Sequence, residues 1–180
     1  YDMIGNFMYQ QSMDSGERWM LNNVMNMPVW KRDSKETITE FVYDELHRPI
    51  QIDVTEKDKA LIVAGRMEYG EPYASDINYL RGKVVKAYDG AGIIATDDYD
   101  FKGNLLKSSR QLCEDYKNTI DWADVTKVAL LPDKYETQIE YDALNRPVKT
   151  ISPDESVFTP QYNETSLLNA MTVNIRGTIA

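Results

Sequence analysis

Apolar and polar residues alternate with a period of two along several stretches of this chain. In the stretch 48–55, Ile50, Ile52 and Val54 alternate with polar residues, and in the stretch 135–141 Tyr, Thr and Ile alternate with Glu and Gln. Successive side chains of an extended chain point to opposite faces, so this alternation is typical of strands with one solvated face. The pattern therefore predicts strands on both sides of the turns described next.

Five short motifs that begin with Tyr-Asp punctuate the sequence. The residue three positions after each Asp is Gly, His or Asn, the types that adopt a left-handed backbone most readily. Asp at the first position of a type I turn, followed by a left-handed residue, closes a hairpin with a bulge. The Asp side chain is expected to accept bonds from N–H groups within the turn. The predicted turn residues are Tyr1, Asp2 and Gly5; Tyr43, Asp44 and His47; Tyr88, Asp89 and Gly92; Tyr99, Asp100 and Gly103; and Tyr141, Asp142 and Asn145.

The spacing of the motifs predicts a meander, in which consecutive strands pair with each other. Tyr88 and Tyr99 lie eleven residues apart, so two tight turns leave room for a single strand between them. The stretch 30–43 predicts a further hairpin, with its turn at 33–35. Each isolated hairpin is barely stable, so the hairpins must join in one larger sheet.

Two stretches break the alternation. The stretch 74–82 is predicted as a short helix, with Ser75 as its N-cap and Gly82 as its stop. The stretch 108–134 mixes helical spacing with loop residues and predicts a surface excursion with structure of its own. The predicted fold class is therefore all-β, an antiparallel meander of hairpins with one or two short helices on loops. We interpret residues 1–180 as a single fragment of a larger polypeptide.

Composition and charge narrow the function classes. The chain has 180 residues, of which 42% are hydrophobic, and a formal net charge of -9. An acidic chain is repelled by phosphate backbones and by anionic membranes, so we expect no nucleic-acid partner. No apolar run approaches the roughly 20 residues that a membrane helix needs. Cys113 is the only cysteine, which excludes an internal disulfide and a cysteine-based zinc site.

No constellation of residues predicts catalysis. His47 is the sole histidine, and it occupies a turn position that Gly or Asn fills in the other motifs. The acidic residues in 97–100 do not have the spacing of a calcium loop. Acidic neighbours make Cys113 a poor nucleophile. We therefore expect no enzyme activity, no catalytic residue, no cofactor and no bound metal. A hydrolase with two facing carboxylates is the weakest alternative.

The motif Tyr-Asp-x-x-Gly/Asn-Arg/Asn resembles that of the YD-repeat, or Rhs, family. The stretches 78–104, 99–112 and 115–122, together with "NIRG" at 174–177, are similar to one part of the large Rhs-type proteins related to the B component of insecticidal toxin complexes. The resemblance covers most of residues 43–177 and is most specific over 80–112.

The resemblance implies a wall of antiparallel strands that winds into a hollow shell around a C-terminal toxin domain. The paired Asp-Pro-x-Gly motifs of the family's self-cleaving core are absent, and Asp154 lacks that pattern. The implied function is therefore a non-catalytic section of the shell that encapsulates and helps deliver a toxin.

The implied partners are the remainder of the parent chain and the enclosed toxin domain. The implied location is secreted or at the cell surface, in a bacterium. Exposed sheet edges would also allow self-association. An extracellular carbohydrate-binding or adhesion module stays open as the alternative, because repeated tyrosines stack on sugars and teneurins use a similar shell for adhesion.

Overall fold

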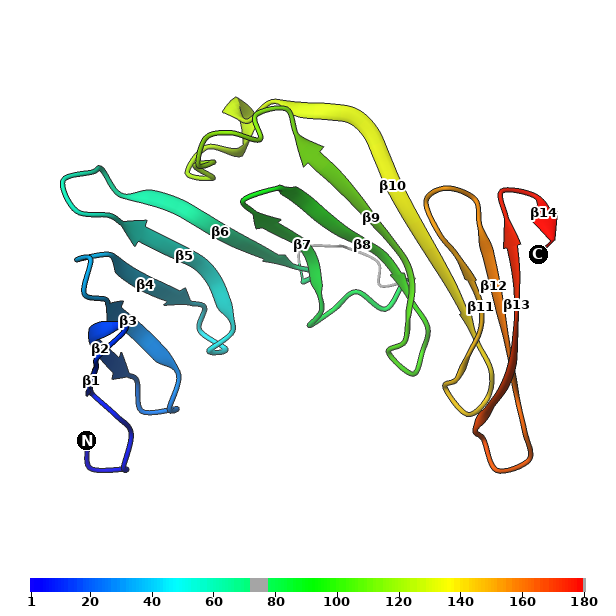
Figure 1. The fold of residues 1–180 in the computed structure, drawn as a ribbon, viewed down its shortest axis with the longest axis horizontal. Helices are drawn as coiled ribbons and strands as arrows, with labels where there is room; N and C mark the ends of the chain where they lie inside the picture. Colours follow the sequence, from blue (N-terminus) through cyan, green and yellow to red (C-terminus); the bar gives the residue numbers. More distant parts are fainter. Residues whose placement is uncertain (72–77, 180) are drawn as a thin grey trace. The chain divides into compact units, whose positions relative to one another are not determined.

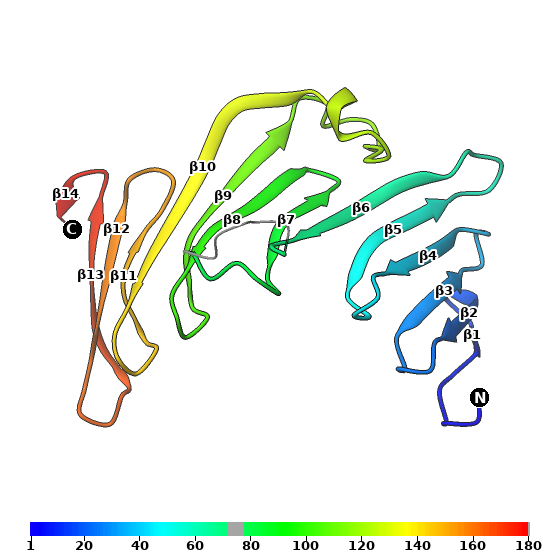
Figure 2. The ribbon, with the colours of Figure 1, turned by 180° about the vertical axis from the view of Figure 1, so that it is seen from behind.

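The structure is a computed structural model that describes residues 1–71 and 78–179. In this part of the chain there are fourteen strands and one 3-10 helix, η1, at Val125–Lys127. Figures 1 and 2 show the strands from opposite sides, each following the previous one through a reversal of the chain. The predicted all-β antiparallel meander is confirmed.

The described residues form two compact units. The first comprises Tyr1–Met67, Tyr88–Ala91 and Asp115–Ala129, and the second comprises the remaining described residues. In the first unit, consecutive strands pair antiparallel in chain order. Its strands are β1 (Tyr9–Ser12), β2 (Gly16–Asn22), β3 (Pro28–Arg32), β4 (Ile38–Tyr43), β5 (Pro49–Thr55) and most of β6 (Ile62–Tyr69).

The second unit is also a meander. Strands β8 to β14 pair antiparallel in chain order. Its strands are most of β7 (Val84–Asp89), then β8 (Gly92–Tyr99), β9 (Leu105–Cys113), β10 (Leu130–Tyr141), β11 (Pro147–Ile151), β12 (Val157–Tyr162), β13 (Leu168–Ile175) and β14 (Thr178–Ile179).

The strand register shifts where strands enter turns. In β4 the shift falls between Val42 and Tyr43, and in β10 it falls between Glu140 and Tyr141. The strand pairs β2–β3, β8–β9 and β12–β13 show a shift at the corresponding residue. A bulge of this kind follows from a hairpin turn that ends on a left-handed residue, as the motif predicts.

Most of the sheet has no second layer among the described residues. Only six hydrophobic residues there are buried, and Trp122 is the one large side chain with no exposed surface, at 0%. The predicted surface excursion begins after β9, and residues 115–129 of it belong to the first unit. Within that unit the Trp122 ring lies 5.0 Å from the ring of Tyr88. The excursion therefore supplies the best-buried side chain of the first unit.

The predicted helix over 74–82 is not found in the part that the structure describes. Residues 74–77 lie outside the described residues, and 78–82 form turns and irregular backbone. The N–H of Gly70 donates to the carbonyl of Lys83, and the N–H of Lys83 donates to the carbonyl of Leu80. These bonds close the chain between β6 and β7 without a helix.

Gly92 supports a sharp prediction, because it lies in β8 against the neighbouring strand. A Cβ at Gly92 would lie 2.1 Å from the carbonyl oxygen of Gln111, and the residue has a φ of 145°. Gly92→Ala should therefore destabilise the chain by about 3 kcal/mol in urea unfolding. Gly90→Ala is the matched control, because a Cβ there has nothing within 4 Å, and it should change stability by less than about 0.5 kcal/mol. Equal effects of the two substitutions would contradict this account of β8.

Candidate functional site

The most regular feature of the molecule is the turn that follows the Tyr-Asp motif. At Asp44, the backbone N–H donates to the carbonyl of Arg48 at 3.0 Å, and the N–H of His47 donates to the carbonyl of Asp44 at 2.9 Å. The Asp44 Oδ1 accepts the N–H groups of Leu46 and Arg48 at 2.9 and 2.8 Å. One carboxylate oxygen thus satisfies two N–H groups that the strands leave unpaired.

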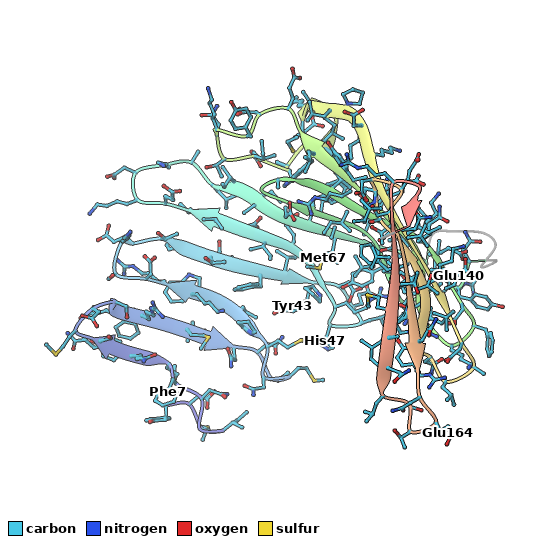
Figure 3. All side chains as sticks on the ribbon, turned by 45° about the vertical axis from the view of Figure 1, so that its right-hand side comes forward. Phe7, Tyr43, His47, Met67, Glu140 and Glu164 are labelled. Carbon is cyan, nitrogen blue, oxygen red and sulfur yellow. The ribbon has the colours of Figure 1, made fainter. Side chains whose placement is uncertain are left out.

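The left-handed residue of this turn is His47, with a φ of 59°. Figure 3 shows His47 and Tyr43 on the turn between β4 and β5. The second carboxylate oxygen of Asp44 accepts the Nε–H and Nη2–H groups of Arg48, both at 2.7 Å. The turn is therefore closed by an Asp, a left-handed residue and an arginine in fixed positions.

Three other motifs have the same bonding pattern. The Asp oxygen accepts the N–H groups two and four residues later at Asp2, Asp100 and Asp142. The partner of the second oxygen is Asn at the first two turns and Arg146 at the third. The left-handed residues are Gly5, Gly103 and Asn145.

The motif at Tyr88 folds differently from the other four. Asp89 ends β7 and Gly92 already begins β8, so only two residues form the loop. The Asp89 Oδ1 accepts the N–H of Ala91 at 2.9 Å. Gly92 has a φ of 145°, far from the values near 60° at His47 and Asn145. Glycine is needed there because Gln111 lies so close.

Asparagine forms the same turn at two positions that the Tyr-Asp motif does not identify. The Asn23 Oδ1 accepts the N–H groups of Met25 and Met27, and the Asn163 Oδ1 accepts those of Thr165 and Leu167. The left-handed residues are asparagine and serine. A 21-residue spacing would have identified both turns, because it relates Asp2, Asn23 and Asp44, and also Asp100, Asp121, Asp142 and Asn163.

Asp121 has the spacing of a turn residue but bonds to a distant strand. Its Oδ1 accepts the N–H of Ala123 at 3.0 Å, as in the other turns, and the N–H of Val63 at 2.9 Å. The N–H of Trp122 donates to the carbonyl of Val63 at 2.9 Å, and its Nε1–H donates to the carbonyl of Asp89 at 3.0 Å. We call residues 120–122 the clasp, because they satisfy both backbone groups of Val63.

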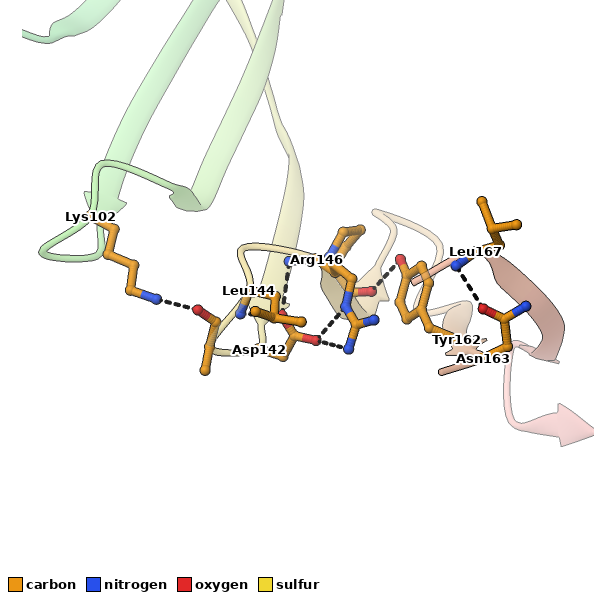
Figure 4. A network of polar contacts seen from close by, with 9 residues as sticks. Lys102, Asp142, Leu144, Arg146, Tyr162, Asn163 and Leu167 are labelled. Atoms are coloured by element: carbon orange, nitrogen blue, oxygen red, sulfur yellow. Dashed lines mark hydrogen bonds and ion pairs between the residues drawn. The ribbon is translucent and has the colours of Figure 1, made fainter. Parts of the chain in front are cut away.

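Tyrosines connect each turn to the hairpin before it. The hydroxyl of Tyr43 donates to the carbonyl of Pro28 at 2.7 Å, and that of Tyr162 donates to the carbonyl of Pro147 at 2.9 Å. The guanidinium of Arg146 lies 4.6 Å from the centre of the Tyr162 ring, which adds a cation–π contact. Figure 4 shows these contacts around Asp142.

Neighbouring turns of the second unit also bond directly to each other. The Lys102 Nζ donates to the carbonyl of Ala143 at 2.7 Å, and the Asn104 Nδ2 donates to the Asn145 Oδ1 at 3.0 Å. The first of these bonds is drawn in Figure 4. The turns therefore form a ladder along the sheet edge, and not a set of isolated reversals.

The turn bonds lower the pKa of the turn carboxyls. At Asp142 the N–H of Arg146 is the main cause, with the guanidinium of the same residue adding to the effect. At Asp44 burial alone would raise the pKa, but the backbone and side chain of Arg48 outweigh it. The hydroxyls of Ser156 and Ser152 lower the pKa of Asp154 to about 2. Each of these carboxyls is thereby held in its ionised form.

The described residues offer no arrangement suited to catalysis or metal binding. No group of three or more His, Cys, Asp or Glu side chains in 1–71 and 78–179 is placed to hold a metal ion. Cys113 is buried, and His47 lies at the tip of an exposed turn. The acidic residues at 97–100 fall on strand β8 and the turn after it. The site of interest is therefore structural.

No helix among the described residues has both the length and the apolar character that crossing a membrane requires.

His47 tests the backbone requirement of the turn. The residue is left-handed, a conformation that disfavours side chains other than Gly, Asn and Asp by about 1–2 kcal/mol. His47→Gly should therefore keep or raise the free energy of unfolding, whereas His47→Ala should not raise it. The control is Glu45→Ala in the same turn, expected within about 0.5 kcal/mol of the parent. Denaturant unfolding measures all three variants, and a His47→Gly variant less stable than His47→Ala would contradict the assignment.

The lowered carboxyl pKa values predict how stability depends on pH. An Asp whose pKa is lower in the folded chain stabilises it above the unfolded value of 3.8, and this contribution is lost as the pH falls through the folded value, about 2 for Asp154. The urea midpoint should therefore fall between pH 4 and pH 2 through these groups. Asp154→Asn should make this fall shallower, measured by urea unfolding at several pH values. An equally steep fall in that variant would show that Asp154 does not contribute.

Comparison with known proteins gives a consistent picture. The toxin subunit YenC2 of Yersinia entomophaga is 27% identical to this chain, over 98% of the chain and 20% of YenC2. No family model matches the chain. The chain thus spans about a fifth of the length of this curated relative.

Solved structures share the fold. The crystal structure of TcdB2-TccC3 matches with a TM-score of 0.90 and 21% identity, over 99% of this chain and 9% of that one. A Tc holotoxin pore of Photorhabdus luminescens matches with a TM-score of 0.91, at the same identity and coverage. In sequence and in fold, the chain therefore resembles a section of the YD-repeat, Rhs-type proteins of bacterial toxin complexes.

Proposed function

We propose that this chain is a non-catalytic section of the wall of a YD-repeat shell, and that the shell encloses a toxin and helps deliver it. The observation that carries the proposal is the ladder of turns, in which side chains bond one hairpin to the next. A wall needs many hairpins held in register, and it needs no reactive centre. The match to one continuous section of much longer chains supports the same function.

The proposal implies that the chain is one piece of a longer polypeptide. Its partners are then the rest of that polypeptide and an enclosed toxin domain, and its location is outside a bacterial cell or at the cell surface. A wall of paired strands would shield an enclosed chain from proteases, because the backbone groups of the wall are already bonded to each other.

Carbohydrate binding or adhesion is the second candidate, and the motif tyrosines do not favour it. Sugar recognition by the repeated motif requires tyrosine rings that are open to solvent. Tyr88 is buried, and Tyr43, Tyr99 and Tyr141 are only partly exposed. The hydroxyl of Tyr43 is also engaged with Pro28. The wall function therefore accounts better for the repeated tyrosines.

Limited proteolysis of the full-length parent polypeptide tests the proposal. If the chain is part of a closed wall, a segment outside the YD repeats should resist a protease in the folded protein and be cleaved after unfolding in urea. Gly92→Ala should open the wall and expose that segment, whereas the control Gly90→Ala should leave it protected. Cleavage of every segment outside the repeats at similar rates in folded and unfolded protein would overturn the proposal.

A further inference from the structure

The turns of the first unit lie alternately at two edges of its sheet. Because consecutive strands are antiparallel, the turns at 2–6, 23–27 and 44–48 share one edge, which we call the Asx edge. The turns at 33–37 and 56–59 lie at the other, which we call the opposite edge. The two edges therefore present different sets of turn tips, where a tip means the two residues that follow the first residue of a turn.

The tips of the Asx edge are apolar and exposed. Ile4 is 70% exposed, Met25 57% and Leu46 67%. Met3 and Val24, also at tips, are exposed as well. Glu45 is the one charged residue among the six tip residues of this edge. Three successive turns thus present aliphatic side chains in a row.

The opposite edge has polar tips at these two turns. The tips are Ser34 and Lys35 in one turn and Lys57 and Asp58 in the next. Among the turns before β6, Met13, in the short loop between β1 and β2, is the apolar exception at this edge. The difference between the edges is therefore one of chemistry and not only of position.

The geometry of the turn does not require apolar tips. The turn at Asp33 has the same bonds as that at Asp44: its Oδ1 accepts the N–H groups of Lys35 and Thr37 at 2.9 Å, and Glu36 is left-handed. Its tips are nevertheless polar. The same backbone thus carries polar tips at one edge and apolar tips at the other, so the apolar tips need another explanation.

The second unit shows the same preference. The tips of its turns at Asp100 and Asp142 include Phe101 and Leu144, both exposed. The turn that begins at Ser152 has Pro153 and Asp154 at its tip. The turn at Asn163 is an exception, with polar tips.

We propose that the Asx edge of the first unit is an interface that packs against another section of the same longer polypeptide. The inference rests on the proposed function. Single exposed apolar residues are ordinary, but a row of them marks an interaction surface. Burial of each side chain contributes about 1.5–3 kcal/mol. The matched relative extends far beyond this chain, which spans 20% of it, so the occupant can be another part of the polypeptide.

The chemistry of the tips defines the surface that they contact. With five aliphatic side chains and one acid, the edge fits an uncharged apolar surface and offers no cation for a phosphate. A lipid surface is the less favoured occupant, because anionic membranes attract basic residues and the tips have none. The opposite edge, with lysines and acids at its tips, would face solvent.

Thiol labelling of the full-length polypeptide tests the interface. Leu46→Cys places a thiol at the Asx edge, and Lys35→Cys places one at the opposite edge as the matched control. Both positions are exposed within the described residues, so protection of Leu46→Cys must come from elsewhere. Labelling should be slowed about tenfold or more by folding at Leu46→Cys and little changed at Lys35→Cys, relative to the urea-unfolded protein. Parent polypeptide without either substitution gives the background, including that of buried Cys113.

Equal labelling of Leu46→Cys and Lys35→Cys in the folded polypeptide would overturn the inference. Protection of Leu46→Cys that appears only with uncharged phosphatidylcholine vesicles would overturn it in favour of a lipid surface. The two proposals fail separately. Loss of the protease-protected segment would remove the shell, whereas a protected segment together with a reactive Leu46→Cys would remove only this interface.

Discussion

The structure depends on one interaction, in which a short side chain accepts the backbone N–H groups of a turn. A sheet of this kind reverses direction many times, and each reversal leaves N–H groups without a strand partner. At Asp44 a single carboxylate oxygen accepts two of them within 2.9 Å. Asn23 and Asn163 do the same with an amide oxygen, so the bond requires an acceptor two and four residues before the N–H groups and not a charge. The charge adds the ion pair with arginine at Asp44 and Asp142.

These turn bonds matter more here than in a globular domain, because few side chains are buried. Six hydrophobic residues among those described make up the buried core, so most hairpins are not held by burial. The bond between Asn104 and Asn145 and the contact of Tyr162 with Pro147 join hairpins through the edges of the sheet. A wall that must present both faces to its surroundings is well served by bonding of this type.

Local sequence predicted the strands and the meander but not the clasp. The alternation in the stretch 48–55 and the left-handed residue types at His47 and Asn145 are local signals, and the fold has the all-β meander that they predict. The clasp depends on a bond between Asp121 and Val63, which are 58 residues apart. No local pattern encodes such a contact, so the stretch around Trp122 resembled a surface excursion. The turns at Asn23 and Asn163 were missed because the motif was defined by Tyr-Asp.

The clasp and the turn ladder have a common origin in the repeat. Asp121 lies 21 residues from both Asp100 and Asp142, and its carboxylate still accepts the N–H two residues later. What differs is the second acceptor bond, which goes to Val63 and not to the N–H four residues later. Trp122 then occupies a turn tip, the position held by Glu45 and Ala143 in regular turns, but it is fully buried. The exposed aliphatic tips of the regular turns are chemically suited to the same kind of burial. A turn of this repeat therefore serves either as a reversal at the sheet edge or as a plug, depending on whether its tip has a surface to enter.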